Sequence, residues 1–262
     1  MNPQGPIWRI VLVRPRNPLN IGAAARAIAN FGFKDLVIVA PYEPAWREAR
    51  SAVGAEEIIQ SARSVSTLAE ALNDVTLVVG TTSGQRRRLD RELISLDKLS
   101  EWLDAHADHG RAALLFGSEK TGLSNENMSY CHALARIPTI ARCPSMNLGQ
   151  AVAVCCFELA KRARMGSEAE EKSEQPCADG SGSSSMGSEA CVHISAPANI
   201  QSLEHIFERA ACVLDEVGYL KPKSREATLI KLRRMLIERG LSNHDAKILG
   251  GILAQIEWKL KL

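Results

Sequence analysis

A short segment near the start of the chain, Asn20-Ile-Gly-Ala-Ala-Ala-Arg26, could bind a ligand and stabilise a negative charge. Asn20 and Gly22 follow an apolar run and open a helical pattern, and the backbone N–H groups at such a helix start attract anions. Gly22 allows a backbone or a ligand to approach closely, and Arg26 lies about one helical turn later. The alternative is a packing role, in which glycine and alanine allow a tight helix–sheet contact and Arg26 is simply solvated.

A second segment, Gly117-Ser-Glu-Lys-Thr-Gly122, is similar to a phosphate-binding loop only at first sight. A P-loop needs Lys-Ser/Thr after its second glycine, whereas the Lys-Thr pair precedes that glycine here. The chain also lacks the GxGxxG pattern of ordinary dinucleotide-binding folds. What remains is a strand end, a glycine, Glu119 and Ser124 as a helix N-cap. This combination favours a neutral or cationic ligand over a polyphosphate.

Two further loops combine hydroxyl and amide side chains. Pro144-Ser-Met-Asn-Leu148 stands just before a long helical pattern, where Ser145 and Asn147 can bind an adenine edge or cap that helix. Thr81-Thr-Ser83 ends an apolar run, and open α/β sheets place ligands at the carboxyl ends of their strands. A run of three arginines follows in the next loop, which is either solvated or in contact with RNA phosphates.

The elements that would position these residues alternate between strands and helices over residues 1–165. Apolar β-like runs predict five strands, at 8–13, 36–39, 75–80, 112–116 and 134–137. Amphipathic or alanine-rich patterns predict helices at 23–31, 95–106 and 148–164. A further short helix is predicted after Thr67-Leu-Ala-Glu70, which fits a capping box. The alternation predicts an α/β domain with a mainly parallel sheet and helices on both faces.

The remainder of the chain differs in composition and charge. Residues 166–189 carry six acidic residues and one lysine, and such a stretch is too polar to fold alone. We therefore predict a flexible linker rich in Ser, Gly and Glu at 166–198. Residues 221–262 are basic, with ten Lys and Arg against four Asp and Glu. A small all-helical domain is predicted at 199–262, from helical patterns at 200–217, 224–239 and 243–259.

The bulk composition excludes several classes of protein. The chain has 262 residues, of which 45% are hydrophobic and 24% charged, with a net charge of +2, as in ordinary globular proteins. It has no apolar run long enough to span a membrane. The first residues lack the pattern of a signal peptide, so we expect a cytoplasmic protein without membrane contact. Seven cysteines without CxxC spacing predict neither a disulfide framework nor a metal site.

In order and spacing, the segments at 20–26, 116–123 and 137–151 resemble the three signature motifs of the SPOUT RNA methyltransferases, in the branch that methylates ribose 2′-hydroxyls. The helical end, with Gly218-Tyr-Leu220 and Lys231-Leu-Arg-Arg234, resembles the carboxyl-terminal extension of the TrmJ-type tRNA enzymes. The resemblance implies that the helical domain at 199–262 binds tRNA and supports the dimer. The resemblance implies a SPOUT fold with a deep trefoil knot, S-adenosylmethionine as cofactor, and a homodimer with a shared active site. It also implies tRNA as substrate, at nucleotide 32 of the anticodon loop.

The resemblance further assigns roles to individual residues. Arg26 would activate the ribose hydroxyl by stabilising its developing negative charge, while Asn20 and Ser145 would orient the nucleotide. The residues implied in cofactor binding are Thr81, Thr82, Ser83, Gly117, Glu119, Ile137, Pro144, Ser145, Met146, Asn147 and Leu148. Those expected to contact RNA are Arg86, Arg87, Arg88, Lys231, Arg233 and Arg234.

Two alternatives fit the same residues. One is a SPOUT methyltransferase of ribosomal RNA, although those enzymes often carry an RNA-binding extension before the first motif, which this chain does not show. The other is a non-catalytic RNA-binding protein that kept the fold. Within motif three, Met146 stands where relatives often have leucine. The two side chains have similar volumes, so the exchange should leave cofactor binding intact.

Overall fold

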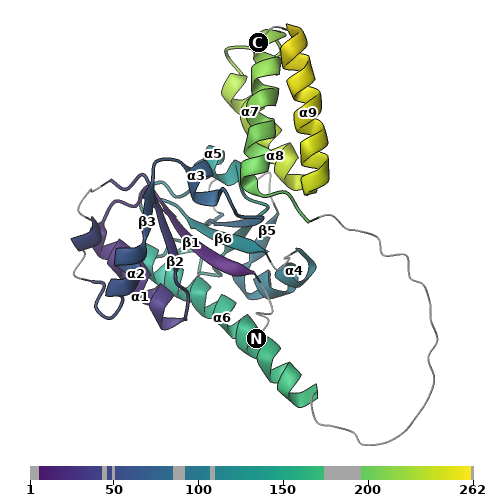
Figure 1. The fold of residues 1–262 in the computed structure, drawn as a ribbon. Coiled ribbons are helices and arrows are strands. Elements are labelled where there is room, and N and C mark those ends of the chain that lie inside the picture. Colours follow the sequence, from purple (N-terminus) through teal and green to yellow (C-terminus); the bar gives the residue numbers. More distant parts are fainter. Residues whose placement is uncertain are drawn as a thin grey trace, which may run out of the picture.

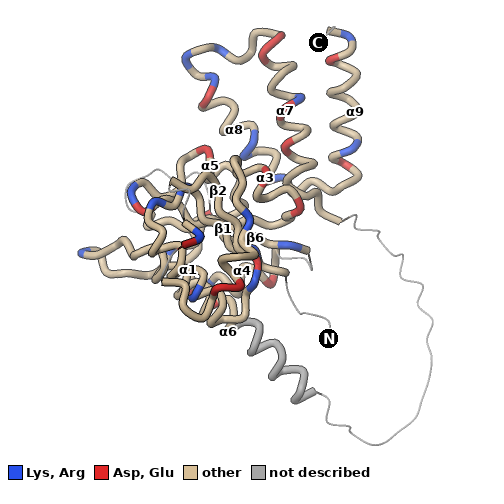
Figure 2. The backbone as a smooth tube through the Cα atoms, turned by 60° about the vertical axis from the view of Figure 1, so that its left-hand side comes forward, with Lys and Arg blue, Asp and Glu red and all other residues tan. Residues whose placement is uncertain are grey.

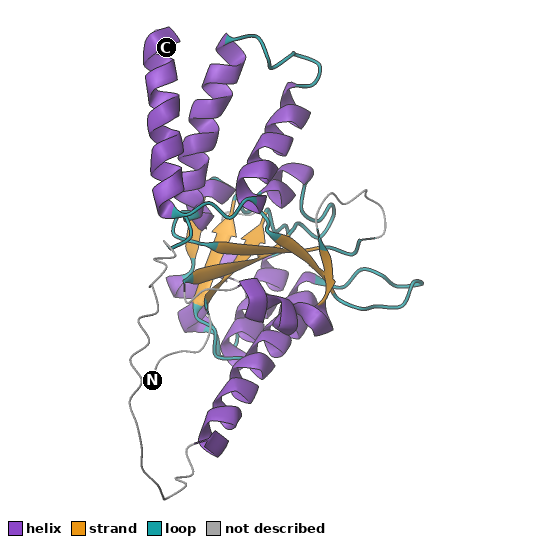
Figure 3. Ribbon diagram, turned by 90° about the vertical axis from the view of Figure 1, so that its right-hand side faces the viewer, coloured by secondary structure: helices purple, strands orange, loops and turns teal. Residues whose placement is uncertain are grey.

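The computed structural model describes residues 6–42, 46–48, 51–84, 92–106, 110–173 and 196–260. A seven-stranded sheet lies between two layers of helices, and three long helices stand on one of these layers (Figure 1, Figure 3). Every pair of neighbouring strands within the described residues is parallel, which confirms the predicted α/β class. Within the same ranges, no helix is long and apolar enough to cross a membrane.

The sheet is built from β1 (Ile7–Val13), β2 (Asp35–Val39), β3 (Arg63–Val65), β4 (Leu77–Thr81), β5 (Leu93–Ser95), β6 (Arg111–Phe116) and β7 (Ala133–Arg136). Their order across the sheet is β3-β2-β1-β6-β4-β7-β5. The central strands β1, β6 and β4 are apolar and buried on both faces, as expected for parallel strands covered by helices. The sequence did not predict β3 and β5, because a strand of three residues carries too little periodicity.

The last strand does not lie at an edge of the sheet. β7 pairs with β4 on one side and with β5 on the other, so the chain returns to a position between two earlier strands. The trefoil knot that the resemblance implies stays a prediction, because strand order does not describe how the chain is threaded.

One face of the sheet is covered by α1 (Pro18–Asn30), α2 (Glu56–Ser61), α4 (Leu99–His106) and α6 (Leu148–Ser173). Small residues let α1 and α6 pack closely, because a β-carbon on Gly149 would lie 2.7 Å from the β-carbon of Ala23. Cys155 and Cys156 are buried in this layer, and burial raises the pKa of the Cys156 thiol to about 12. Both cysteines therefore serve as small apolar side chains.

The opposite face is covered by α3 (Leu68–Leu72) and α5 (Asn125–Ser129), and on them stand α7 (Ile200–Glu216), α8 (Arg225–Glu238) and α9 (Asn243–Leu260) (Figure 1). The backbone N–H of Ile200 donates to the carbonyl of Val75 at 2.9 Å, which ties the start of α7 to the residues before β4. Ile206 and Phe207 of α7 belong to the same buried cluster as Leu134 of β7. The three helices therefore share a core with the sheet.

The segment predicted as a linker is structured at both of its ends. α6 continues to Ser173, beyond the predicted end at 164, and the Glu, Ala and Lys residues there are good helix formers. Before α7, the N–H of Ala198 donates to the carbonyl of Leu241 at 2.8 Å. Residues 174–195 lie outside the described residues, and the boundaries at 165 and 199 stay predictions.

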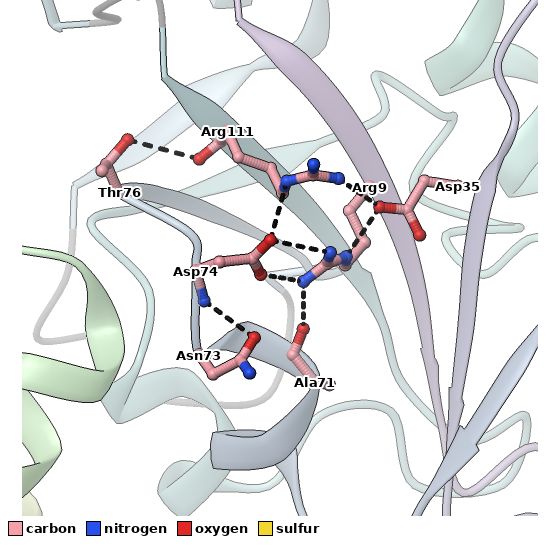
Figure 4. A network of polar contacts seen from close by, with 7 residues as sticks. All are labelled: Arg9, Asp35, Ala71, Asn73, Asp74, Thr76 and Arg111. Carbon is pink, nitrogen blue, oxygen red and sulfur yellow. Dashed lines mark hydrogen bonds and ion pairs between the residues drawn. The ribbon is translucent and has the colours of Figure 1, made fainter.

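The amino edge of the sheet is closed by a network of charged side chains (Figure 4). Arg9 of β1 is 3% exposed, and its guanidinium donates to Asp35 at 2.9 Å and to Asp74 at 2.6 Å. Arg111 of β6 pairs with the same two carboxylates, at 2.7 Å and 2.9 Å. The Nη1 of Arg9, which donates to Asp74, also donates to the carbonyl of Ala71 at 2.7 Å. The charges at this edge are therefore paired with one another.

Candidate active site

A cavity of about 580 Å³ lies at the carboxyl edge of the sheet, beyond the ends of β4, β6 and β7. Its walls come from the loops after these three strands and from the first turn of α6. This is where open α/β sheets place their ligands. The lining combines apolar side chains with hydroxyl groups and backbone amides, and the volume suits a small organic molecule.

The loop after β6 forms one wall of the cavity as a tight turn. The N–H of Gly122 donates to the carbonyl of Ser118 at 2.8 Å, and Gly122 has a φ of +66°. A β-carbon on Gly117 would lie 2.0 Å from the backbone carbon of Gly122, so only glycine fits there. Ser124 caps α5 as predicted, because its hydroxyl accepts from the N–H of Asn127 at 3.1 Å.

Asn20 connects the three segments that the sequence analysis selected. Its Nδ2 donates to Oε1 of Glu119 at 2.9 Å, and its Oδ1 accepts from Nδ2 of Asn147 at 2.9 Å. Asn147 also caps α6, because its Oδ1 accepts from the N–H of Gly149 at 2.9 Å. These bonds hold the start of α1, the turn after β6 and the loop before α6 in fixed relative positions.

Glu119 is the charged member of this group. Besides Asn20, its carboxylate accepts from the backbone N–H groups of Arg16 at 2.9 Å and Asn17 at 3.1 Å. Partial burial acts to raise the pKa of Glu119, but the hydrogen bonds from Asn20 and the backbone outweigh it, so the pKa lies below its usual value. The carboxylate is therefore ionised at neutral pH, and it places a negative charge in the cavity wall.

The remaining walls come from the loops after β4 and β7. The hydroxyl of Thr81 donates to the carbonyl of Leu115 at 2.8 Å, and that of Thr139 donates to the carbonyl of Pro144 at 3.2 Å. These two hydroxyls therefore brace the loops. Ser145 carries an exposed side chain in the same wall, where a ligand can reach it.

The structure brings most of the expected cofactor residues to this one cavity. The members of that set that line it are Thr81, Thr82, Ser83, Gly117, Glu119, Ile137, Pro144, Ser145, Met146 and Leu148. Asn147 is not among the described residues that line the cavity, but it caps α6 and bonds to Asn20. Lys120 and Thr139 also line the cavity, although the resemblance implied neither of them in cofactor binding. Their place in loops that follow strand ends was the signal that could have indicated them.

The residues expected to act on RNA are more scattered. Arg26 is exposed on α1 and is not among the described residues that line the cavity. Lys231 is exposed on α8, whereas Arg234 is half-buried and pairs with Glu238 at 3.6 Å. The helices α7, α8 and α9 each carry both basic and acidic residues (Figure 2). The three arginines of the loop after β4, Arg86, Arg87 and Arg88, lie outside the described residues.

Arg233 was expected to contact RNA, but it does not lie at the surface of the protein. Its side chain is buried and donates to both oxygens of Glu204, at 2.7 Å and 3.2 Å. The guanidinium carbon lies 4.0 Å from the ring centroid of Phe207 and 4.4 Å from that of Tyr130. Arg233 therefore joins α8 to α7 and to the end of α5. A basic run on a helix does not reveal which of its members faces the core.

The described part of the chain holds no group of three or more His, Cys, Asp or Glu side chains placed to bind a metal ion.

A protein family and several individual proteins match this chain. The model of the SpoU rRNA Methylase family matches residues 8–157. That range contains every cavity-lining loop described above.

Individual relatives extend the match to the helical end of the chain. The chain is 39% identical to the uncharacterized tRNA/rRNA methyltransferase LasT of Escherichia coli, over 63% of this chain and 73% of that protein. It is 32% identical to tRNA (cytidine/uridine/adenosine-2′-O-)-methyltransferase TrmJ of Pseudomonas aeruginosa, over 95% of this chain and 93% of the relative. The crystal structure of TrmJ from Z. mobilis ZM4 matches with a TM-score of 0.76 and 27% identity, and covers 95% of this chain and 98% of that one.

Proposed function

The chain belongs to the SpoU rRNA methylase family, and from this premise we propose that it transfers a methyl group from S-adenosylmethionine to a ribose 2′-hydroxyl of tRNA. The observation that carries the proposal is the cavity lined by the second and third motif segments, to which Asn20 of the first segment is joined through Glu119 and Asn147. Relatives that match nearly the full chain are named as tRNA 2′-O-methyltransferases, which supports tRNA as the substrate.

The cavity residues fit S-adenosylmethionine. Ile137 and Leu148 offer an apolar surface for a flat base, and the tight turn at Gly117 leaves backbone groups in the wall. The negative charge of Glu119 favours a cationic sulfonium compound and disfavours a polyphosphate. When bound, the cofactor supplies an electrophilic methyl group.

The chain must then place the ribose oxygen in line with that methyl group and favour the oxygen's negative charge. Arg26 is the candidate for the second task. A guanidinium holds its proton too tightly to act as an ordinary base, so Arg26 would stabilise the developing oxyanion electrostatically. Ser145, exposed in the wall, would orient the nucleotide, and Asn20 would keep the loops in register.

A second copy of the chain would complete the site. Arg26 is exposed on α1 and is not among the described residues that line the cavity of its own chain. This position supports a homodimer in which Arg26 of one chain acts at the cavity of the other. Arg26→Ala protomers mixed with Gly117→Ala protomers should regain part of the activity that each homodimer lacks. Heterodimers of confirmed composition that stay inactive would contradict a shared site.

The target within tRNA is nucleotide 32 of the anticodon loop in this proposal. The resemblance of the helical end to TrmJ-type enzymes supports it, and Lys231 and Arg234 on α8 are its candidate phosphate contacts together with Arg86, Arg87 and Arg88. Arg233 does not belong to this group, because its guanidinium is used inside the protein.

Titration calorimetry tests the cofactor assignment directly. S-adenosylmethionine should bind the purified protein with one site per chain, and ATP at the same concentration should not compete with it. ATP shares the adenosine but replaces the sulfonium by phosphates, so it is the matched control for the charge of Glu119. Competition by ATP, or no binding of S-adenosylmethionine, would contradict the proposal.

A further inference from the structure

The segment Arg14-Pro-Arg16 lies beside the cavity and has no role in the function proposed so far. It joins the end of β1 to the start of α1. The backbone N–H of Arg16 donates to Oε2 of Glu119 at 2.9 Å, and Glu119 lines the cavity. The side chain of Arg16 therefore starts from the rim of the cavity.

The backbone around this segment is held in an unusual shape. Arg14 and Ala40, which follow the neighbouring strands β1 and β2, have φ values of +52° and +44°. Left-handed conformations are uncommon for residues with a β-carbon and concentrate at functional sites. Backbone hydrogen bonds fix both turns, from the N–H of Arg14 to Val39 at 2.8 Å and from that of Tyr42 to Pro15 at 3.1 Å.

This backbone brings a cation onto an aromatic ring at the surface. The guanidinium carbon of Arg16 lies 4.6 Å from the ring centroid of Tyr42, and Tyr42 is 64% exposed. Arg14 is exposed beside them. Within the part of the chain that the structure describes, no carboxylate pairs with the side chains of Arg14 or Arg16. The positive charges and the ring thus face solvent at the rim of the cavity.

We propose that Arg14, Arg16 and Tyr42 form a docking platform for the RNA strand next to the target nucleotide. A neighbouring unpaired base stacks on the Arg16–Tyr42 pair, because single-stranded RNA is read by aromatic rings and guanidinium planes. Arg14 contacts a flanking phosphate. The inference rests on the proposed function, since it takes the ligand of the cavity rim to be RNA.

Binding of unmodified tRNA transcripts, followed by fluorescence anisotropy and by steady-state methylation, tests this platform. Tyr42→Ala should weaken tRNA binding and raise KM for tRNA by about 10-fold. Tyr42→Phe should behave as wild type, because the ring face is kept. Arg16→Ala keeps the backbone N–H that binds Glu119, so S-adenosylmethionine affinity should not change. In Arg14→Ala, which loses the proposed phosphate contact, the slope of log affinity against log salt should fall by about one.

Tyr42→Phe provides the matched control, because it removes only the hydroxyl group and keeps the ring on which the base would stack. A loss of tRNA affinity in Tyr42→Phe as large as in Tyr42→Ala would overturn the platform. If the wild type binds and methylates tRNA while Tyr42→Ala is unaffected, the platform alone is wrong. If the wild type binds no tRNA, the proposed function fails as well.

Discussion

The two edges of the central sheet use similar polar groups for opposite purposes. At the amino edge, Arg9 and Arg111 are paired with Asp35 and Asp74 (Figure 4). At the carboxyl edge, the described partners of Glu119 are three neutral N–H groups, and its charge faces a cavity of about 580 Å³. Ion pairs therefore cancel the charges at the amino edge, whereas neutral groups hold the charge of Glu119 at the carboxyl edge.

The comparison predicts a separation of effects. Substitutions at the amino edge should change the free energy of unfolding and leave ligand binding intact, because none of the four charged residues there lines the cavity. Substitutions at the carboxyl edge should lower the affinity for the ligand. Each of the following predictions would sharpen or break this separation.

The largest expected effect is that of Gly117→Ala. The added methyl group would overlap the backbone of Gly122, so the turn must move and the cavity wall with it. We expect S-adenosylmethionine affinity to fall by about 100-fold, as for other misplacements of a binding wall. Gly250→Ala is the control, because its β-carbon would meet nothing within 4 Å. Calorimetry on both variants checks this, and wild-type affinity in Gly117→Ala would contradict the assignment of the cavity.

Arg9→Met should have the largest effect on stability. It leaves the partly buried carboxylates of Asp35 and Asp74 with fewer partners, and the free energy of unfolding should fall by about 3 kcal/mol. Arg225→Met removes a surface pair with Asp215 and should cost less than about 0.5 kcal/mol. Denaturant unfolding measures both. A loss of cofactor affinity in folded Arg9→Met would break the separation between the two edges.

Asn20→Ala removes the side chain that joins Glu119 to Asn147. Because a hydrogen bond to a charged group is lost, we expect cofactor affinity to fall by about 10-fold. Asn73→Ala is the counterpart at the amino edge, where the Asn73 side chain accepts from the N–H of Asp74 at 2.8 Å. That variant should bind the cofactor as the wild type does. Equal affinities in the two variants would show that the cross-link does not support the cavity.

The smallest expected effect is a loss of folding stability at acid pH. Burial acts to raise the pKa of Asp74, but the hydrogen bond and charge of Arg9 and the charge of Arg111 outweigh it, so the pKa is lowered in the folded state. The stabilisation is complete above the unfolded value of about 3.9 and is lost as the pH falls through the lower folded value. Unfolding curves of the wild type should therefore lose stability below about pH 4. Asp74→Asn should show a flatter dependence, and an unchanged slope would exclude Asp74 as its source.

The carboxyl edge was largely predictable from the sequence. Thr81, Gly117 and Ile137 follow or end apolar runs, and the ends of parallel strands must meet at one edge. The bonds of Asn20 were not predictable, because its partners lie 99 and 127 residues away. A sequence pattern gives the position of a side chain along an element but not its partner across the fold.

The amino edge and the helical end show the limits of periodicity more clearly. In the sequence, Arg9 is recognisable only as a charged residue within an otherwise apolar strand. The neighbouring residues give no indication that Asp35 and Asp74 are its partners. Arg233 was wrongly expected at the surface, because its burial depends on Glu204 and on two rings from other helices. Buried charges are specified by tertiary contacts, which local pattern does not encode.

Methyl transfer to RNA tests the central claim most directly. The purified protein would be incubated with methyl-labelled S-adenosylmethionine and unmodified tRNA transcripts, and ribose methylation would be mapped, with Arg26→Ala as the control. The account predicts label on a ribose 2′-oxygen at anticodon-loop nucleotide 32, lost in Arg26→Ala although that variant still binds the cofactor. Methylation of ribosomal RNA but not of tRNA would contradict tRNA as the substrate. If the protein did not bind S-adenosylmethionine, the assignment of the cavity as the cofactor site would be contradicted.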